Sequence, residues 1–227
     1  MSHYWLIPIV AYLLGSIPFG YLLYRWRYGA DIRREGSGNI GATNVLRRAG
    51  PGLGIATLAC DAGKGMLALV LADFLGYQTL APQQYVFMRT TAQVPTYHYD
   101  WIALAIVAVM LGHMYTPWLR GRGGKGVATG LGLFLTLAPR ALPWALLIFI
   151  AVVAIWRFVS LASIVAAIIM PPLIWLNYGH AYPPGIYLAA SLCALLIIWR
   201  HRANLRRLRA GQEHRFQWKT RTRSAAG

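Results

Sequence analysis

The fold depends on residues 127–156, whose sequence is VATGLGLFLTLAPRALPWALLIFIAVVAIW. This stretch contains one charged residue, Arg140, which lies between Pro139 and Pro143. A helix needs about 20 apolar residues to cross a bilayer, so the stretch forms either one long crossing or two short ones. Because proline ends helices and favours turns, the sequence predicts a tight turn between two separate helices.

The composition is typical of an integral membrane protein. Hydrophobic residues make up 57% of the 227 residues and charged residues 12%, with a mean hydropathy of +0.47. An average soluble domain carries roughly twice that share of charged residues. The two cysteines, Cys60 and Cys193, lie in apolar stretches, which indicates buried thiols and excludes a disulfide scaffold.

Apolar stretches recur along most of the chain, and we expect seven of them to form membrane helices. The first has no basic residue before it and no cleavage pattern after it, so we interpret it as a retained anchor and not as a signal peptide. The seven stretches are approximately residues 4–24, 53–75, 101–115, 127–138, 142–156, 161–176 and 186–199.

The basic residues favour seven crossings over six. Four segments, 25–52, 118–126, 157–160 and 200–227, carry 19 of the 22 Lys and Arg residues. All four lie in the cytoplasm if the chain crosses seven times, as the positive-inside rule requires. We therefore predict an all-α, polytopic integral membrane protein with seven transmembrane helices, the N-terminus outside and the C-terminus cytoplasmic. We expect a single membrane-embedded domain over residues 1–227, ending in a basic tail from about 214.

The net charge points to a negatively charged partner. The formal charge is +16, from 22 basic and six acidic side chains. Phosphorylated substrates and anionic lipid headgroups both fit this charge, whereas so apolar a chain argues against nucleic acid.

The first polar motif is residues 31–48, DIRREGSGNIGATNVLRR. Gly36, Gly38 and Gly41 match the G-x-G-x-x-G pattern, but apolar stretches flank them where a dinucleotide site needs a βαβ unit. Glycine amides can still converge on an anion. Neighbouring side chains add donors for phosphate, namely Ser37, Thr43, Asn44 and Arg47. An ordinary flexible loop with basic flanks explains the local sequence equally well.

The second motif is residues 121–129, GRGGKGVAT. It differs from a Walker A loop because Gly126 stands where Ser or Thr must hold magnesium, so no nucleotide hydrolase is implied. We expect free glycine amides, the start of the next helix and Lys125 to face an anion together. The alternative is a tight hinge, which does not need four glycines in six positions.

The third motif is residues 200–208, RHRANLRRL, followed by Glu213. In a helix, His201 and Asn204 are three residues apart and share a face. A structural histidine is the commoner case. The predicted topology nevertheless puts all three motifs on one side of the membrane.

Two further polar features lie at or within the apolar stretches. Asp61 and Lys64 are one helical turn apart, and we expect them to pair with each other or with a buried polar site. Ser160 is either a helix N-cap or an extension of the phosphate site.

Several common catalytic patterns are missing. No His is followed five positions later by Asp, as in the His-x4-Asp box of other acyltransferases, and there is no G-x-S-x-G elbow. No Cys/His set suits a metal. We expect no metal and no cofactor, and a site that stabilises anionic charge with cations and neutral donors.

Together the motifs resemble those of the bacterial membrane acyl-phosphate:glycerol-3-phosphate acyltransferase family. The resemblance rests on GSGNIGATNVLR (36–47), GGKGVAT (123–129), HRANLRRL (201–208), DAGKG (61–65) and Gly112-His113, and it extends to about Glu213. The family usually has Lys before the paired glycines, where this chain has Arg122.

The resemblance implies transfer of a fatty acyl group from acyl phosphate to the sn-1 hydroxyl of glycerol 3-phosphate. The products are lysophosphatidic acid and inorganic phosphate, and the substrate's own phosphate accepts the proton. The implied polar site consists of Ser37, Arg47, Lys125, Ser160, His201 and Asn204. The implied phosphate-binding backbone consists of Gly38, Asn39, Thr43, Gly123, Gly124, Lys125 and Gly126. To the candidate binding set we add Gly41, Asn44, Lys64 and Glu213.

The same resemblance implies the location and partners. We expect a monomer in the bacterial inner membrane with its active site facing the cytoplasm, in contact with membrane lipid and binding no nucleic acid. Two other functions fit parts of the sequence. A transporter for a phosphorylated anion also uses basic residues and glycine-broken helices, but no internal repeat is present. A membrane scaffold with basic loops would not need the glycine-rich motifs.

Overall fold

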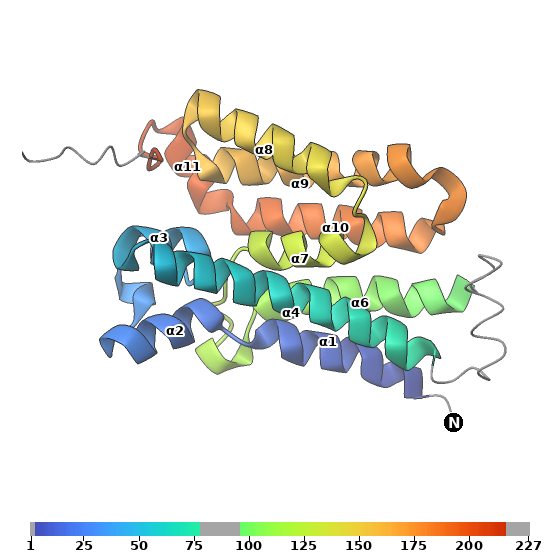
Figure 1. The fold of residues 1–227 in the computed structure, drawn as a ribbon. Helices are drawn as coiled ribbons and strands as arrows, with labels where there is room; N and C mark the ends of the chain where they lie inside the picture. The colour runs from blue at the N-terminus through green and yellow to red at the C-terminus, as the bar shows by residue number, and fades with distance from the viewer. Residues whose placement is uncertain (1–2, 78–95, 217–227) are drawn as a thin grey trace, which may run out of the picture.

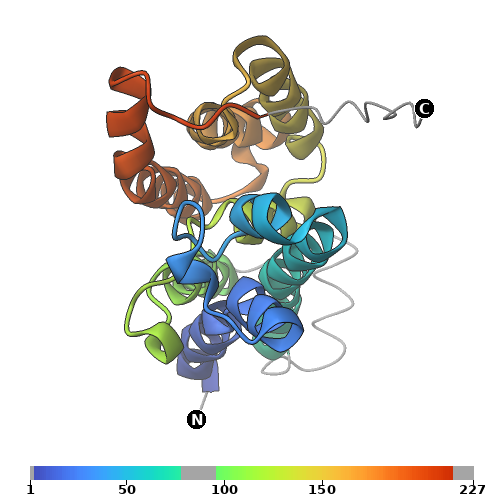
Figure 2. The ribbon, with the colours of Figure 1, turned by 90° about the vertical axis from the view of Figure 1, so that its left-hand side faces the viewer.

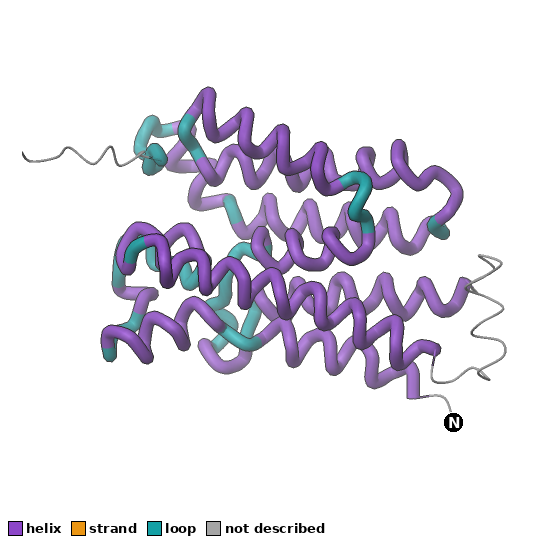
Figure 3. The backbone as a smooth tube through the Cα atoms, viewed as in Figure 1, coloured by secondary structure: helices purple, strands orange, loops and turns teal. Residues whose placement is uncertain are grey.

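The computed structural model describes residues 3–77 and 96–216, and these residues form helices with short connections and no strand (Figure 3). The predicted all-α class is confirmed for them. The α-helices are α1 (Leu6–Ser16), α2 (Phe19–Tyr28), α3 (Ala42–Ala49), α4 (Pro51–Tyr77), α6 (Thr96–Met114), α7 (Val127–Leu137), α8 (Leu142–Trp156), α9 (Val159–Tyr178), α10 (Pro184–Arg200) and α11 (Arg202–Arg209). Short 3-10 turns are η1 (His3–Trp5), η2 (Ile32–Arg34), η3 (Pro117–Leu119) and η4 (Gly179–Ala181). Most of the basic tail expected from about residue 214 lies outside the described residues.

Each predicted apolar stretch contains an apolar helix. Four are long enough to cross a membrane, namely Leu6–Tyr28, Pro51–Gly76, His98–Leu119 and Val159–Ala181, and α10 with α11 adds a fifth if that pair, bent by 54°, is one span. The helices α7 and α8 are shorter, with 11 and 15 residues. The turn expected at Pro139–Pro143 separates these two, since α7 ends at Leu137 and α8 begins at Leu142.

The first apolar stretch is broken, which the sequence analysis did not predict. Helix α1 ends at Ser16 and α2 begins at Phe19, because Pro18 cannot donate the hydrogen bond that continues a helix. Side chains from α4 and from the connection after α6 satisfy the carbonyl groups freed by the break. The hydroxyl of Thr116 donates to the Ser16 carbonyl at 2.6 Å, and Nζ of Lys64 donates to the Ile17 carbonyl at 2.8 Å.

The helices form two groups that pack along their length (Figure 1). Helices α1, α4, α6 and α7 form one group, and α8, α9 and α10 form the other, with α10 also contacting α6. Glycines allow the closest backbone approaches: a Cβ added at Gly112 of α6 would overlap the backbone of α1, and one added at Gly132 of α7 would overlap that of α4.

Segments far apart in the sequence meet at one end of the bundle. We call this the basic end and define it by residues 25–50, 115–126, 156–159 and 200–216 (Figures 1 and 2). These segments contain the first and third polar motifs and residues 121–126 of the second. The polar motifs therefore meet at the basic end.

Candidate active site

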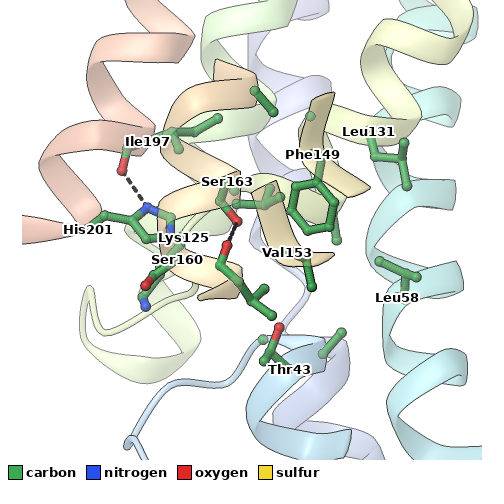
Figure 4. Close-up of a pocket in the computed structure, with 18 of the residues that line it drawn as sticks. Thr43, Leu58, Lys125, Leu131, Phe149, Val153, Ser160, Ser163, Ile197 and His201 are labelled. Carbon is green, nitrogen blue, oxygen red and sulfur yellow. Dashed lines mark hydrogen bonds between the residues drawn. The ribbon is translucent and has the colours of Figure 1, made fainter. Parts of the chain in front are cut away.

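A cavity of about 690 Å³ opens at the basic end, between α3, α4 and α7 on one side and α8, α9 and α10 on the other. Ligand pockets typically have volumes of about 300–1,000 Å³. Lys125, Ser160 and His201 lie together in it, and Leu58 and Leu131 lie across from them (Figure 4). The cavity thus has a polar part and an apolar part. The apolar wall includes Ile55, Leu58, Leu131, Phe149, Val153 and Met170.

The first motif forms a loop fixed from inside by Asn44. This side chain is 2% exposed. Its Nδ2 donates to the carbonyls of Glu35 at 3.0 Å and Asn39 at 2.8 Å, and its Oδ1 accepts from the Ser37 amide at 3.0 Å. Asn44 was expected to contact an anion, but these hydrogen bonds are made to the loop itself.

Three side chains of this motif line the cavity and remain available to a ligand. Within residues 3–77 and 96–216, the side chains of Ser37, Thr43 and Arg47 make no hydrogen bond or ion pair. Burial lowers the pKa of Arg47 below its usual value, but arginine stays charged at physiological pH. The first motif therefore presents one hydroxyl group from its loop, Ser37, and one hydroxyl group and one cation from α3, Thr43 and Arg47.

The second motif folds back into the bundle. The chain leaves α6 at Met114, and the amides of Gly123 and Gly124 then donate to the carbonyls of Met114 at 3.2 Å and His113 at 3.0 Å. Helix α7 therefore starts level with the last turn of α6, which explains why it is short. The two glycine amides were expected to be free for an anion, whereas they are bonded to α6.

Lys125 follows the glycine pair and lines the cavity. Its Nζ donates to Oδ1 of Asn204 at 2.6 Å, which uses one of its three donors. Burial lowers the pKa of Lys125 to about 8, against the opposing charge of Glu213. At neutral pH Lys125 is therefore still a cation with two donors to spare.

Glu213 joins the start of α9 to α11. Its carboxylate accepts from Oγ of Ser160 at 2.8 Å, from Nδ2 of Asn204 at 2.6 Å and from Nε of Arg207 at 2.8 Å. Burial alone would raise the pKa of Glu213, but these hydrogen bonds outweigh it and leave the pKa below its usual value. Because Nδ2 of Asn204 is bonded to Glu213, its Oδ1 is turned toward Lys125.

His201 lies at the break between α10 and α11, 2% exposed, and lines the cavity. Its Nδ1 is 2.8 Å from the carbonyl oxygen of Ile197. A carbonyl only accepts, so Nδ1 carries the proton and Nε2 is an acceptor in the neutral ring. Burial, with the nearby charge of Lys125, lowers the pKa of His201 to about 4, so the ring is neutral at physiological pH.

Most of the predicted site residues line this cavity. They are Ser37, Asn39, Gly41, Thr43, Asn44, Arg47, Lys125, Gly126, Ser160, His201, Asn204 and Glu213. Four others, Gly38, Gly123, Gly124 and Lys64, are not among its lining residues. Lys64 instead lies 2.7 Å from Oδ1 of Asp61, which confirms the predicted ion pair.

The predicted site did not include several polar residues that line the cavity, namely Asp61, His113, Ser163, Arg207 and His214. Arg207 lies three residues after Asn204 on α11, so their shared helix face was the available signal. Asp61 was recognised as a buried charge but not as a cavity residue.

Comparison with known proteins shows the family of this chain. A model of the family described as glycerol-3-phosphate acyltransferase matches residues 5–211. The chain belongs to this family. It is 44% identical to a glycerol-3-phosphate acyltransferase of Trichlorobacter lovleyi, over 91% of this chain and 94% of the relative. It is 50% identical to one of Geobacter metallireducens, over the same shares of the two chains.

Solved structures agree with this membership. The fold is similar to the crystal structure of PlsY (YgiH), an integral membrane glycerol 3-phosphate acyltransferase, in its glycerol 3-phosphate form. The TM-score is 0.78 at 35% identity, covering 94% of this chain and 96% of that one. The lysophosphatidic acid form of PlsY gives 0.76 at 33% identity, over 94% and 95% of the chains. This chain is accordingly an integral membrane acyltransferase of the PlsY type.

Proposed function

We propose that this enzyme transfers a fatty acyl group from acyl phosphate to the sn-1 hydroxyl of glycerol 3-phosphate. Lysophosphatidic acid and inorganic phosphate are the products. The observation that carries the proposal is one cavity in which two cations, Arg47 and Lys125, adjoin a long apolar wall. Such a cavity suits two phosphorylated substrates of which one carries an acyl chain. The substrate and product in the related PlsY structures support the same assignment.

The polar part of the cavity holds the phosphate groups. Arg47 offers a fork of parallel donors, and Lys125 offers two hydrogens not used by Asn204. The hydroxyls of Ser37 and Thr43 add neutral donors from the neighbouring loop. Holding both substrates in one orientation accelerates transfer, because it converts an encounter of two molecules into a reaction between fixed groups.

The apolar wall receives the acyl chain. Ile55 and Leu58 of α4 and Ile150 of α8 line the cavity and are 40–62% exposed. The acyl chain lies along these exposed apolar side chains, next to the surrounding lipid.

The transfer step needs no strong protein base. The hydroxyl oxygen attacks the acyl carbonyl carbon, the bond from that carbon to the phosphate oxygen breaks, and the hydroxyl proton leaves on inorganic phosphate. Nε2 of His201 accepts a hydrogen bond from the attacking hydroxyl and orients it. With a pKa of about 4, His201 is too weak a base to keep the proton, so the departing phosphate takes it.

The proposed topology has seven crossings with the basic end in the cytoplasm of a bacterial inner membrane. Exposed tryptophans support it, since tryptophan is enriched at both membrane interfaces. Trp26, Trp118 and Trp156 lie at the basic end and Trp199 directly precedes it, whereas Trp5, Trp144 and Trp175 lie toward the other end. Helix α8 extends from near Trp144 to Trp156, which supports a full crossing despite its 15 residues. The whole chain then acts as one domain, and as a monomer because one chain supplies every group of the proposed site.

Turnover by the purified enzyme tests the function. We expect enzyme in lipid nanodiscs to release inorganic phosphate from palmitoyl phosphate only when glycerol 3-phosphate is present, with one sn-1 lysophosphatidic acid formed per phosphate. Lys125→Met should lower kcat/KM by about 10²-fold or more, the usual effect of losing one charge-stabilising donor. Arg206→Met removes an exposed cation at the basic end and serves as the matched control. Phosphate release without glycerol 3-phosphate, or turnover of palmitoyl-coenzyme A only, would contradict the proposal.

A further inference from the structure

The glycine pair before Lys125 is held on the side that faces α6. The amides of Gly123 and Gly124 donate to α6 carbonyls, as described above. A Cβ added at Gly124 would lie 2.6 Å from Cε1 of His113, and one added at Gly123 would lie 2.8 Å from the carbonyl carbon of Met114. Only glycine fits this close to α6, so the amide side of the pair is fixed by packing and by two hydrogen bonds.

The carbonyl side of the same pair is held by Arg200, the last residue of α10. Its Nη2 donates to the Gly123 carbonyl at 2.7 Å and its Nε to the Gly124 carbonyl at 3.0 Å. The guanidinium also lies over the ring of Tyr115, 5.2 Å from its centre, which limits its movement. The peptide groups immediately before Lys125 are therefore bonded on both sides.

Arg200 also precedes His201 directly, so one residue connects both halves of the polar site. His201 and Asn204 directly follow Arg200 in the chain, at the start of α11. Lys125 directly follows the glycine pair whose carbonyls Arg200 binds. The hydrogen bond between Lys125 and Asn204 cannot perform this task alone, because it joins the tips of two side chains and leaves the Lys125 backbone unbonded. The backbone therefore needs an anchor that does not depend on the Lys125 side chain.

We propose that Arg200 is a positioning residue, which fixes the backbone of Lys125 relative to His201 and Asn204 by donating to two successive carbonyls. This inference rests on the proposed function for its effect on turnover. Arginine suits the task because its planar fork bonds two acceptors at once, whereas a lysine ammonium on a flexible stem acts as a point charge. Arg200 itself touches no reacting atom in this account.

Three variants of the full chain in nanodiscs test the inference: Arg200→Met, Arg200→Lys and the exposed control Arg206→Met. The first readout is the kcat and KM for glycerol 3-phosphate, with palmitoyl phosphate as donor. We expect Arg200→Met to lower kcat/KM for glycerol 3-phosphate at least tenfold, and Arg200→Lys to restore only part of the loss. Restoration of the full kcat/KM by Arg200→Lys would overturn the inference, because charge alone would then suffice.

The second readout does not need turnover. The rate of Lys125 modification by acetic anhydride is measured against pH, by peptide mass spectrometry, and its plateau at high pH reports how accessible the amine is. We expect the plateau of the Lys125 modification rate to be at least fivefold higher in Arg200→Met than in the wild-type enzyme or in Arg206→Met. Equal plateaus would overturn the inference. If the unmodified enzyme fails to turn over, the proposed function fails, while the modification rates still decide whether Arg200 fixes Lys125. If Arg200→Met does not fold, the same two readouts are taken on Arg200→Lys.

Discussion

Replacing Gly124 with alanine tests whether the glycine pair serves close packing. The added Cβ would lie 2.6 Å from Cε1 of His113 and closer still to Nε2, whereas ordinary contacts begin at 3.4 Å. The His113 ring is 3% exposed and lies beside Asp61, with 3.6 Å between Nδ1 and Oδ1, so it has little room to move. The loop must therefore shift by about 1 Å, and Lys125, the next residue, shifts with it.

A misplacement of that size costs about 10²-fold in rate, or roughly 2.7 kcal/mol in the activation barrier. Overpacking also destabilises a fold by about 1–3 kcal/mol. We expect Gly124→Ala to lower kcat about 100-fold in the phosphate-release assay. We also expect it to lower the unfolding temperature, which is measured by size-exclusion chromatography of heated samples. Gly52→Ala is the control, because nothing lies within 4 Å of its added Cβ. If Gly124→Ala keeps activity within twofold of the unmodified enzyme, the packing argument is refuted.

Three further predictions concern charge and topology. Burial lowers the pKa of Lys125 to about 8, so this side chain loses its positive charge as the pH increases from 7 to 9. The KM for glycerol 3-phosphate should therefore rise over this range. A constant KM up to pH 10 would argue against Lys125 as the phosphate cation. Lys64→Met leaves Asp61 buried without its 2.7 Å partner, so the free energy of unfolding in denaturant should fall by about 3–5 kcal/mol, and Asp61→Leu in the same chain should recover part of the loss. The absence of any loss would contradict burial of the ion pair among the helices. Topology is tested with single cysteines in a chain from which Cys60 and Cys193 have been removed. A cysteine at position 122 should react with a membrane-impermeant maleimide only in broken cells, whereas a cysteine at position 181 should also react in intact cells. The opposite pattern would invert the proposed topology.

The helices were predictable because their signal is local. Apolar composition located the seven apolar helical stretches, and Pro139 to Pro143 located the turn between α7 and α8. It did not locate α3, which lies in a polar stretch that was expected to be a loop. The break between α1 and α2 was missed although Pro18 marks it. A proline within an apolar stretch does not say whether the helix kinks or stops: Pro171 and Pro172 lie inside α9 without ending it.

The membership of the site was more predictable than its hydrogen bonds. Residue type and spacing indicated Lys125, His201 and Asn204, and these side chains share one cavity. The bonding of the glycine pair to α6 and to Arg200 could not be predicted, because it depends on contacts between residues about 10 and 76 positions apart. The same holds for Asn44, whose amide was expected to face an anion and is bonded to its own loop.

The proposed site is best tested by a crystal structure with glycerol 3-phosphate and a non-hydrolysable acyl phosphate analogue bound. We expect both phosphate groups within hydrogen-bonding distance of Arg47 or Lys125, the attacking hydroxyl next to Nε2 of His201, and the acyl chain against Leu58 and Phe149. Phosphates bound away from the basic end, or an acyl chain outside the cavity, would contradict it.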